Sequence, residues 1–299
     1  MTRIYESDIE ELTIQLLESI GYTYLPPEDQ ELERKDLTDV VLKGRLIVAV
    51  ERLNPNASAE TKEHAIKEVM RLSSLGVVEN NEAFHKMLTE GIDVEVYKDG
   101  DTKGIKIWLV DFEHPSNNEF LVCNQFTITH ENTTKRPDVV LLVNGLPLVV
   151  IELKNPTDEQ ATVKKAFTQL QNYKTSIPPL FHYNAVLVAS DGLDARAGTL
   201  TSPFSRFLAW KSVDGIKEES ATTPQIETLI VGMLAPKVIL DLVRHFTAFQ
   251  TMDIPDLETG LTQIQTVKIQ AAYHQYFAVN KAVVSTSRAA SDTGDQKVG

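Results

Sequence analysis

Apolar residues in the first third of the chain recur at helical spacing. In residues 8–20 they stand three or four positions apart, and Gly21 follows as a stop signal, which predicts a helix. The same spacing predicts a second helix over residues 58–75 and a shorter helix around residues 82–89. The N-terminal part of the chain is therefore expected to be mostly helical.

The segment at residues 39–53, DVVLKGRLIVAVERL, fits two structures. Asp39, a Lys-Gly turn and Glu51 imitate a charged hairpin, but the apolar residues also fit the spacing of a helix. A hairpin like the one at residues 138–153 would need a lysine two residues after Glu51, but the chain has Leu53 at that position. We therefore favour a helix that ends before Pro55, because a residue that precedes proline disfavours the helical conformation.

Beyond residue 91 the pattern changes from helical spacing to alternation and short apolar runs. This change of period predicts a sheet followed by helices, and the order of elements predicts an α/β sandwich with a central mixed sheet. The predicted elements are a hairpin over 92–112, a strand over 119–130, a hairpin over 138–153, a helix over 157–176, a strand over 183–192, and helices after residue 225 that are interrupted at Pro236.

The most informative stretch is "RPDVVLLVNGLPLVVIELKNP", residues 136–156. Two apolar runs flank Asn144-Gly145, a dipeptide that strongly favours a hairpin turn. Folding at this turn brings Asp138 level with residues 151–153. The strand that ends at residue 153 is too apolar to have one face in water, so we expect it to be buried on both faces.

Three charged residues gather at the end of this hairpin that is farthest from its turn. Side chains alternate along a strand, so Glu152 and Lys154 share one face, with Asp138 close by on the partner strand. A solvated ion pair is the simplest interpretation of such residues, and D…E-x-K alone is a weak pattern. Two converging carboxylates repel each other, however, and therefore favour a bound cation.

The chemistry that fits this set is metal-assisted hydrolysis of a phosphodiester. Oxygen-only ligation by one or two carboxylates suits Mg²⁺. A bound Mg²⁺ polarises a phosphoryl oxygen and acidifies a water. Lys154 could orient that water and offset negative charge that develops on phosphorus.

Composition narrows the class of protein. The 299 residues are 42% hydrophobic, which allows a normal core, and no apolar run is long enough to span a bilayer. The N-terminus lacks the apolar segment of a signal peptide, so we expect a cytoplasmic protein. A single cysteine, Cys123, excludes an internal disulfide and a multi-cysteine zinc site. The net charge of −13 indicates that DNA, if it is the substrate, is held mainly by another domain or subunit.

The charged hairpin resembles the PD-(D/E)xK nuclease motif, with Pro137-Asp138 and Glu152-Leu153-Lys154 as its two halves. Together with "AFTQLQNYKTSIPPLFHYNAVLVASDG" it is similar to the restriction (R) subunit of type I restriction–modification enzymes. The segments "YESDIEELTIQLLESIGYTYL", "LIVGMLAPKVILDLVRHFTAFQ" and "AAYHQYFAVNKAV" extend the resemblance over nearly the whole chain. It implies a restriction-endonuclease-like fold, a central mixed β-sheet flanked by helices, with a helical C-terminal extension.

The resemblance implies roles for individual residues. Asp138 and Glu152 would be the metal-binding pair, and Lys154 the catalytic lysine. Gln169 and Tyr173 match the family's Q-x-x-x-Y element, and their spacing of four places them on one helix face. Alternatively, Tyr173 fills the core and Gln169 lies on the surface.

Two further assignments remain open. Related nucleases carry a glutamate on the first helix near the metal, and Glu10 is the first choice, with Glu6 one turn earlier as the alternative. Arg136 either contacts a phosphate or is simply an exposed arginine at a strand end.

The resemblance also implies a division of the chain. Residues 1–215 would form the nuclease domain, 216–260 a helical linker, and 261–299 the lead-in to a helicase-like motor. The sequence contains no G-x-x-x-x-G-K-[ST] phosphate loop, so we expect the ATP-driven motor to lie outside it. Gln275 resembles the glutamine that contacts adenine ahead of that loop, and ATP would bind only in the longer protein.

The resemblance therefore implies the endonuclease domain of a type I restriction enzyme, cutting double-stranded DNA with Mg²⁺ and without sequence specificity of its own. The methyltransferase (M) and specificity (S) subunits would be its partners, and no membrane is expected. The alternative function is a non-catalytic docking module for the methyltransferase–specificity complex. Retention of all three charged hairpin residues favours the enzyme.

Overall fold

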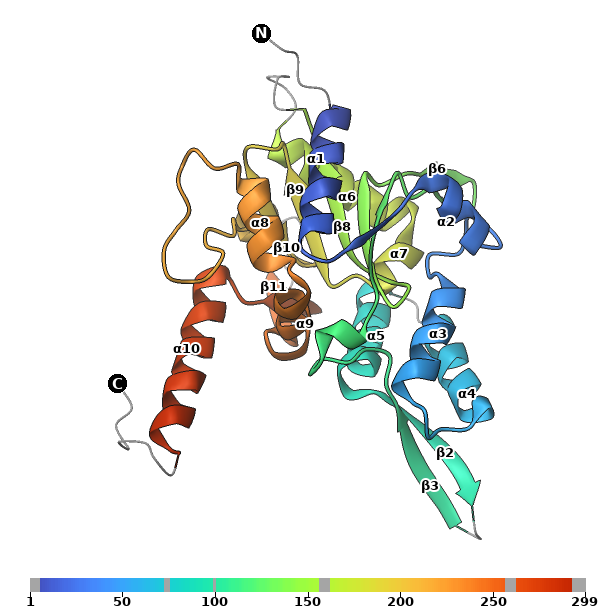
Figure 1. Ribbon diagram of the computed structural model, residues 1–299. Coiled ribbons are helices and arrows are strands. Elements are labelled where there is room, and N and C mark those ends of the chain that lie inside the picture. Colours follow the sequence, from blue (N-terminus) through green and yellow to red (C-terminus); the bar gives the residue numbers. More distant parts are fainter. Residues whose placement is uncertain (1–5, 73–75, 99–100, 156–161, 256–261, 292–299) are drawn as a thin grey trace.

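A six-stranded mixed sheet forms the centre of the protein in the computed structural model, which describes residues 6–72, 76–98, 101–155, 162–255 and 262–291 (Figure 1). Its strands are, in spatial order, β1 (Thr23–Leu25), β4 (Phe120–Asn124), β7 (Val139–Val143), β8 (Leu146–Leu153), β9 (Val186–Ser190) and β10 (Ala195–Gly198). β1 runs parallel to β4 and β8 parallel to β9, whereas the other neighbours are antiparallel. The predicted mixed α/β architecture is confirmed.

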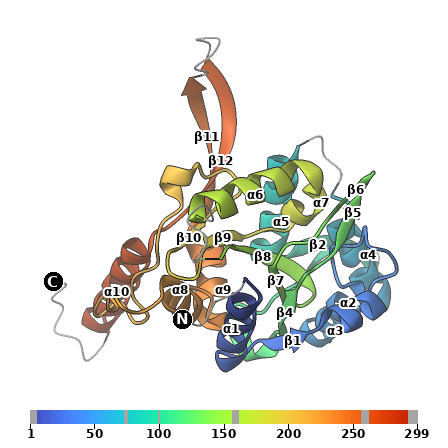
Figure 2. The same ribbon diagram turned by 90° about the horizontal axis from the view of Figure 1, so that it is seen from above.

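Helices cover both faces of this sheet. Figure 2 shows α6 on one face and α1 with α8 on the other. The helices are α1 (Glu6–Ser19), α2 (Pro27–Glu33), α3 (Lys43–Leu53), α4 (Ala59–Met70), α5 (Val77–Glu90), α6 (Val163–Ser176), α7 (Pro178–His182), α8 (Gln225–Met233), α9 (Pro236–His245) and α10 (Tyr273–Ala289), with short 3₁₀ turns η1 (Pro115–Asn117) and η2 (Phe204–Arg206). In the described part of the chain, no helix combines the length and the apolar character that crossing a membrane requires.

Among the residues that the structure describes, three two-stranded hairpins lie outside the main sheet. They are β2 (Ile92–Lys98) with β3 (Asp101–Ile107), β5 (Ile128–His130) with β6 (Thr133–Lys135), and β11 (Thr247–Pro255) with β12 (Thr262–Gln270). The first projects from the body in Figure 1, and the last projects from it in Figure 2. Both projecting hairpins are antiparallel along their whole length.

The β7–β8 turn is held in place from all sides. Asn144 and Gly145 both have positive φ, 52° and 80°, as a tight hairpin turn requires. The Asn144 amide donates to Leu109 O (2.9 Å) and its carbonyl accepts the Glu119 N–H (2.9 Å). A Cβ added at Gly145 would lie only 2.5 Å from Leu42 O, so glycine is needed there. These contacts hold the turn in place. Beyond it the register shifts by one residue between Leu141 and Leu142, so that Val139 pairs with Ile151.

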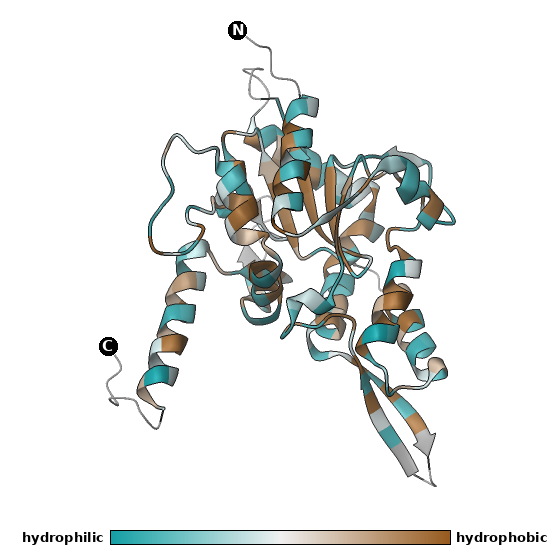
Figure 3. Cartoon of the chain, in the orientation of Figure 1, coloured by the Kyte–Doolittle hydropathy of each residue, from teal (hydrophilic) through white to brown (hydrophobic). Residues whose placement is uncertain are grey.

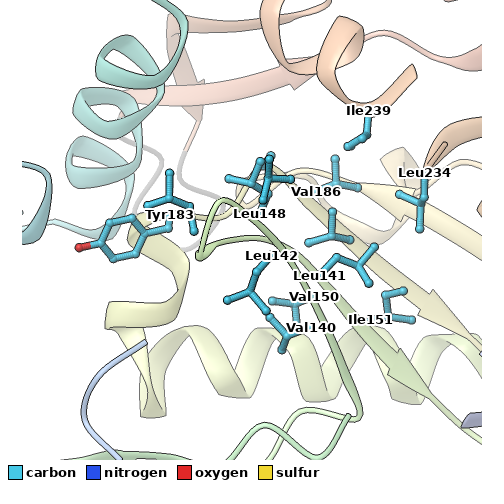
Figure 4. Close-up of a cluster of buried hydrophobic side chains, with 14 of the residues drawn as sticks. Val140, Leu141, Leu142, Leu148, Val150, Ile151, Tyr183, Val186, Leu234 and Ile239 are labelled. Atoms are coloured by element: carbon cyan, nitrogen blue, oxygen red, sulfur yellow. The ribbon is translucent and has the colours of Figure 1, made fainter. Parts of the chain in front are cut away.

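The central strands are buried on both faces, as the sequence predicted. Every residue of β7 and β8 is buried, and Figure 3 shows these strands as the apolar centre of the molecule. Figure 4 shows part of the resulting core, in which side chains of β7, β8 and β9 meet Leu234 and Ile239. Each fully buried Val, Leu or Ile stabilises the fold by about 1.5–3 kcal/mol. The charged residues at the strand ends are thus attached to strands that are packed on both faces.

The structure settles several predictions about the elements. The ambiguous segment at residues 39–53 forms helix α3 from Lys43 onward, as favoured, with Leu46, Ala49 and Val50 buried, whereas residues 39–42 precede the helix. The strand predicted over 119–130 is instead divided into β4 and β5, because Gln125 adopts a positive φ of 51° that breaks the extended conformation. The first residues of the helix predicted over 157–176 lie outside the described residues, and α6 begins at Val163.

The prediction of a helical linker over residues 216–260 is wrong in its last part. Helix α9 ends at His245, and β11 then pairs with β12 from Thr247 onward. The hairpin crosses the boundary that the sequence placed at residue 260. Its threonine, isoleucine and valine residues favour a strand, and this was the signal that could have predicted it.

Candidate nuclease site at the strand ends

The ends of β7 and β8 bring three sequence-predicted residues together. Val139 pairs with Ile151, so Asp138 and Glu152 meet just beyond that pair. The Leu153 N–H donates to Asp138 Oδ2 (2.7 Å), and Lys154 Nζ donates to Glu152 Oε1 (2.7 Å). The predicted convergence of the three residues is confirmed, although their roles stay a prediction.

Glu152 is a completely buried carboxylate with one unbonded oxygen. Its Oε1 accepts from Lys154, while Oε2 has no hydrogen-bond partner among the described residues. Burial, with Asp138 nearby, raises the pKa of Glu152 to about 8 despite the opposing effect of Lys154. A buried polar atom without a partner is costly, so this position favours a proton or a cation.

The neighbouring Asp138 is perturbed in the same direction. Burial raises its pKa to about 6, although the Leu153 N–H and the Lys154 ammonium lower it in part. Glu6 and Glu10 add negative charge that raises the pKa further. Both carboxyl groups therefore release their protons more readily when positive charge is supplied beside them.

Lys154 is held by three oxygens. Besides Glu152, its ammonium donates to Leu153 O (2.8 Å) and to Glu6 Oε1 (3.3 Å), and 16% of its side chain is exposed. Burial alone would lower the pKa of Lys154, but Glu152, Asp138 and Glu6 outweigh burial and raise it. The ammonium is thus charged and directed at the carboxylates.

Helix α1 supplies both glutamates between which the sequence could not decide. Glu6 contacts Lys154 and remains about half exposed. Glu10, one turn later, accepts hydrogen bonds from Asn124 Nδ2 (2.6 Å) and Gln125 Nε2 (2.5 Å). Asn124 and Gln125 were not predictable from the sequence, because nothing in the local pattern shows that these residues meet a helix more than a hundred positions away.

The Q-x-x-x-Y pair lies on α6 with its polar ends together. Gln169 Nε2 donates to Tyr173 OH (2.6 Å), and this hydroxyl lies 3.5 Å from Arg136 O. Burial raises the pKa of Tyr173, and Glu152 and Asp138 add to the shift. The ring therefore belongs to the core while its hydroxyl faces the carboxylates, so parts of both interpretations hold. The Arg136 side chain is exposed.

The residues present fit a divalent cation. Among the described residues no three His, Cys, Asp or Glu side chains gather as a metal-binding set. Mg²⁺ needs only one or two carboxylates and retains several waters. Asp138 and the unbonded Glu152 Oε2 provide this minimal set.

Gln275 lies on a separate element, in the first turn of α10. Its Oε1 accepts the Ala272 N–H (2.9 Å), so part of its side chain serves as a helix cap. It also lines a cavity of about 400 Å³ together with Arg206, Trp210 and Tyr273. Its predicted contact with adenine stays a prediction.

Comparison with known proteins identifies the relatives of this chain. The profile of the family described as "Type I restriction enzyme R protein N terminus" matches residues 3–206. The chain is 40% identical over 303 residues to the Type I restriction enzyme HindI endonuclease subunit of Haemophilus influenzae, covering 98% of this chain and 28% of that protein.

Two further relatives are similar. The putative type I restriction enzyme MjaIXP endonuclease subunit of Methanocaldococcus jannaschii is 30% identical over 93% of this chain and 27% of its own length. The Type I restriction enzyme EcoprrI endonuclease subunit of Escherichia coli is 31% identical over 87% of this chain and 82% of its own length. The chain thus spans little more than a quarter of the first two relatives.

Proposed function

Because the chain belongs to the family of type I restriction enzyme R protein N-terminal regions, we propose that it is an endonuclease domain with the PD-(D/E)xK fold. The observation that carries the proposal is the buried Glu152 oxygen that lacks a partner beside Asp138 and Lys154. At this completely buried position the Glu152 carboxyl group needs either a proton or a cation, and the neighbouring Asp138 carboxylate favours the cation. The proposed reaction is Mg²⁺-dependent hydrolysis of DNA phosphodiesters.

Each residue at the strand ends has a distinct role in this proposal. Asp138 and Glu152 would hold the Mg²⁺, which would supply polarisation of a phosphoryl oxygen and a water of lowered pKa. Lys154, already charged and fixed by Glu152, orients the attacking water and offsets charge on the phosphate. Tyr173 and Gln169 close the site on the α6 side.

The environment of the longer protein completes the proposed function. We propose residues 1–215 as the nuclease domain, and the segment from 261 as the connection to an ATP-driven motor in which Gln275 contacts adenine. Double-stranded DNA, delivered by that motor, is the substrate, and sequence recognition belongs to the methyltransferase and specificity subunits. The charge of −13 supports this division, because a surface this acidic attracts DNA poorly.

Calorimetric titration with Mg²⁺ tests the proposal on this chain. We expect saturable binding to the wild type and none to Asp138→Ala. Binding at neutral pH should release a proton, because Glu152 with its raised pKa must ionise, so the measured heat will depend on the ionisation enthalpy of the buffer. Glu51→Ala, which removes a carboxylate bonded to Lys62 elsewhere, is the matched control. Equal titrations of wild type and Asp138→Ala would instead support the docking-module function.

A further inference from the structure

At the end of β4, the side-chain amides of two consecutive residues donate hydrogen bonds to one carboxylate of α1. Asn124 Nδ2 donates to Glu10 Oε1 (2.6 Å), and Gln125 Nε2 donates to Glu10 Oε2 (2.5 Å). Tyr24 OH donates to Asn124 Oδ1 (2.8 Å) and so orients the Asn124 amide. Each oxygen of Glu10 therefore has its own donor, and the carboxylate is held in one orientation.

The backbone of Gln125 also links the Glu10 carboxylate to the strand ends. Its N–H donates to Asp138 O (2.8 Å), and the preceding residue, Asn124, pairs with Val139. Gln125 holds this position with a φ of 51°, a left-handed conformation that is unfavourable for a residue with a side chain. One residue thus bonds the side chain of Glu10 and the main chain of Asp138.

Glu6, the other candidate glutamate, is held quite differently. It contacts Lys154 Nζ at 3.3 Å, and 46% of its side chain is exposed. Glu10 has two short bonds to neutral amides, which keep its charge available without neutralising it. Glu10 lies close enough to Asp138 to raise the pKa of that carboxyl group, so a carboxylate fixed there suits an outer contact to a cation.

We infer that Asn124 and Gln125 are positioning residues that orient Glu10, rather than Glu6, as an outer contact to the cation held by Asp138 and Glu152. The inference rests on the proposed Mg²⁺-dependent function and adds the residues that fix the outer contact. The amides act through Glu10, so their loss should weaken Mg²⁺ binding about as much as the loss of Glu10 itself. For an outer contact of this kind the expected loss is about 10- to 100-fold.

Gln125→Gly is the decisive variant, because glycine accepts the left-handed conformation and removes only the amide. We expect calorimetry to show a roughly 10-fold weaker Mg²⁺ affinity for Gln125→Gly and for Glu10→Gln. The double variant should be no weaker than Glu10→Gln alone, since both changes remove one interaction. Gln125→Asn, which keeps an amide and tolerates the conformation, should restore part of the affinity.

Glu131→Gly is the matched control, because Glu131 has the same φ of 51° in another turn. It should leave the Mg²⁺ affinity unchanged, and metal-free thermal unfolding should show that all variants fold. Should Gln125→Gly not fold, Glu10→Gln and Glu6→Gln decide the question.

The inference is overturned if wild type binds Mg²⁺, Asp138→Ala does not, and either Gln125→Gly or Glu10→Gln binds like wild type. A loss in Glu6→Gln alone would also overturn it and assign the outer contact to Glu6. No Mg²⁺ binding by the wild type would overturn the proposed function itself, which makes the two failures distinguishable.

Discussion

Glu152 at the strand ends and Lys268 on strand β12 are both buried ionisable residues, but their surroundings differ. Lys268 Nζ donates to Asn81 Oδ1 (2.9 Å) and Asn184 O (2.7 Å) and lies 5.5 Å from the centre of the Phe249 ring. Its acceptors are neutral. Glu152 has a charged partner, a second carboxylate nearby and an unbonded oxygen.

This difference separates a structural group from a binding group. Neutral acceptors satisfy the Lys268 amine, and burial lowers its pKa to about 7, so the protein can hold it uncharged. The Glu152 environment is incomplete without a further proton or cation. Burial of a charge is thus a weak guide to function, whereas burial with unsatisfied bonding capacity is a stronger one.

The largest expected effect comes from Lys154→Ala in the full-length protein. Double-strand cleavage should fall by at least about 100-fold, the typical cost of removing one group that stabilises developing charge. ATP hydrolysis and translocation should be unchanged, since the proposed motor lies beyond residue 299. The fold should survive, because Glu152 can bind a proton when its lysine is removed.

The control for Lys154→Ala is Lys62→Ala, which removes another mostly buried lysine paired with a glutamate. The full-length protein with Lys62→Ala should cleave DNA at the wild-type rate. Cleavage by Lys154→Ala at the wild-type rate would refute the catalytic assignment, and its unfolding would indicate a structural ion pair.

The next effect is on stability in metal-free protein. The folded-state pKa of Glu152, about 8, lies above its ordinary value of 4.5, so the folded state binds more protons between these pH values. The free energy of unfolding must therefore fall as pH rises across this interval, by at most about 1.4 kcal/mol per pH unit. Glu152→Gln should remove this slope in urea titrations at pH 5 to 8. If the free energy of unfolding had the same pH dependence in wild type and in Glu152→Gln, this prediction would be wrong.

Lys268→Met should change the slope in the opposite sense. The folded-state pKa of about 7 lies below the ordinary 10.5, so the folded state binds fewer protons and stability rises with pH between these values. The variant should lose this rise, measured by urea unfolding from pH 7 to 9.5. Mg²⁺ affinity should not change, and a large loss of Mg²⁺ binding would show that the two regions are coupled.

The smallest effect concerns DNA. The chain alone should bind duplex DNA no more tightly than roughly micromolar at physiological salt, with a steep salt dependence. Lys164 and Lys165 are exposed on α6, whereas Lys174 donates to Leu200 O (2.7 Å) and is less available. Replacing Lys164 and Lys165 with alanine should reduce the salt slope by about one to two. Submicromolar affinity in a gel shift would contradict this prediction.

The sequence predicted the hairpin at the site because its determinants are local. The turn dipeptide is enough to place Asp138 level with residues 151–153. Its exact position opposite Glu152 depends on a register shift between Leu141 and Leu142, which the local pattern does not show. The partners of Glu10 were not predictable in this way, since Asn124 and Gln125 reach it only through the tertiary fold. Lys154 also departs from expectation, because a lysine at a strand end normally keeps its ammonium in water, whereas this one is mostly buried.

The β11–β12 hairpin shows a different limit. Helix α9 ends at His245 and β11 begins at Thr247, so the change of period comes with only Phe246 between the two elements and without a Gly or Pro to mark it. Strand β1 has only three residues, too few for a periodic signal, and its parallel pairing with β4 joins segments about a hundred residues apart. Such pairings depend on the whole fold rather than on a local pattern.

The buried turn at Asn144-Gly145 has a consequence for protein engineering. Hairpin turns are usually the first choice for inserting a tag, a fluorescent reporter or new chain termini, because loop tips tolerate change. Here the Asn144 side chain bonds Leu109 and Glu119, and Leu42 packs against the glycine. An insertion at this turn would shift the strand register and separate the carboxylates at the other end.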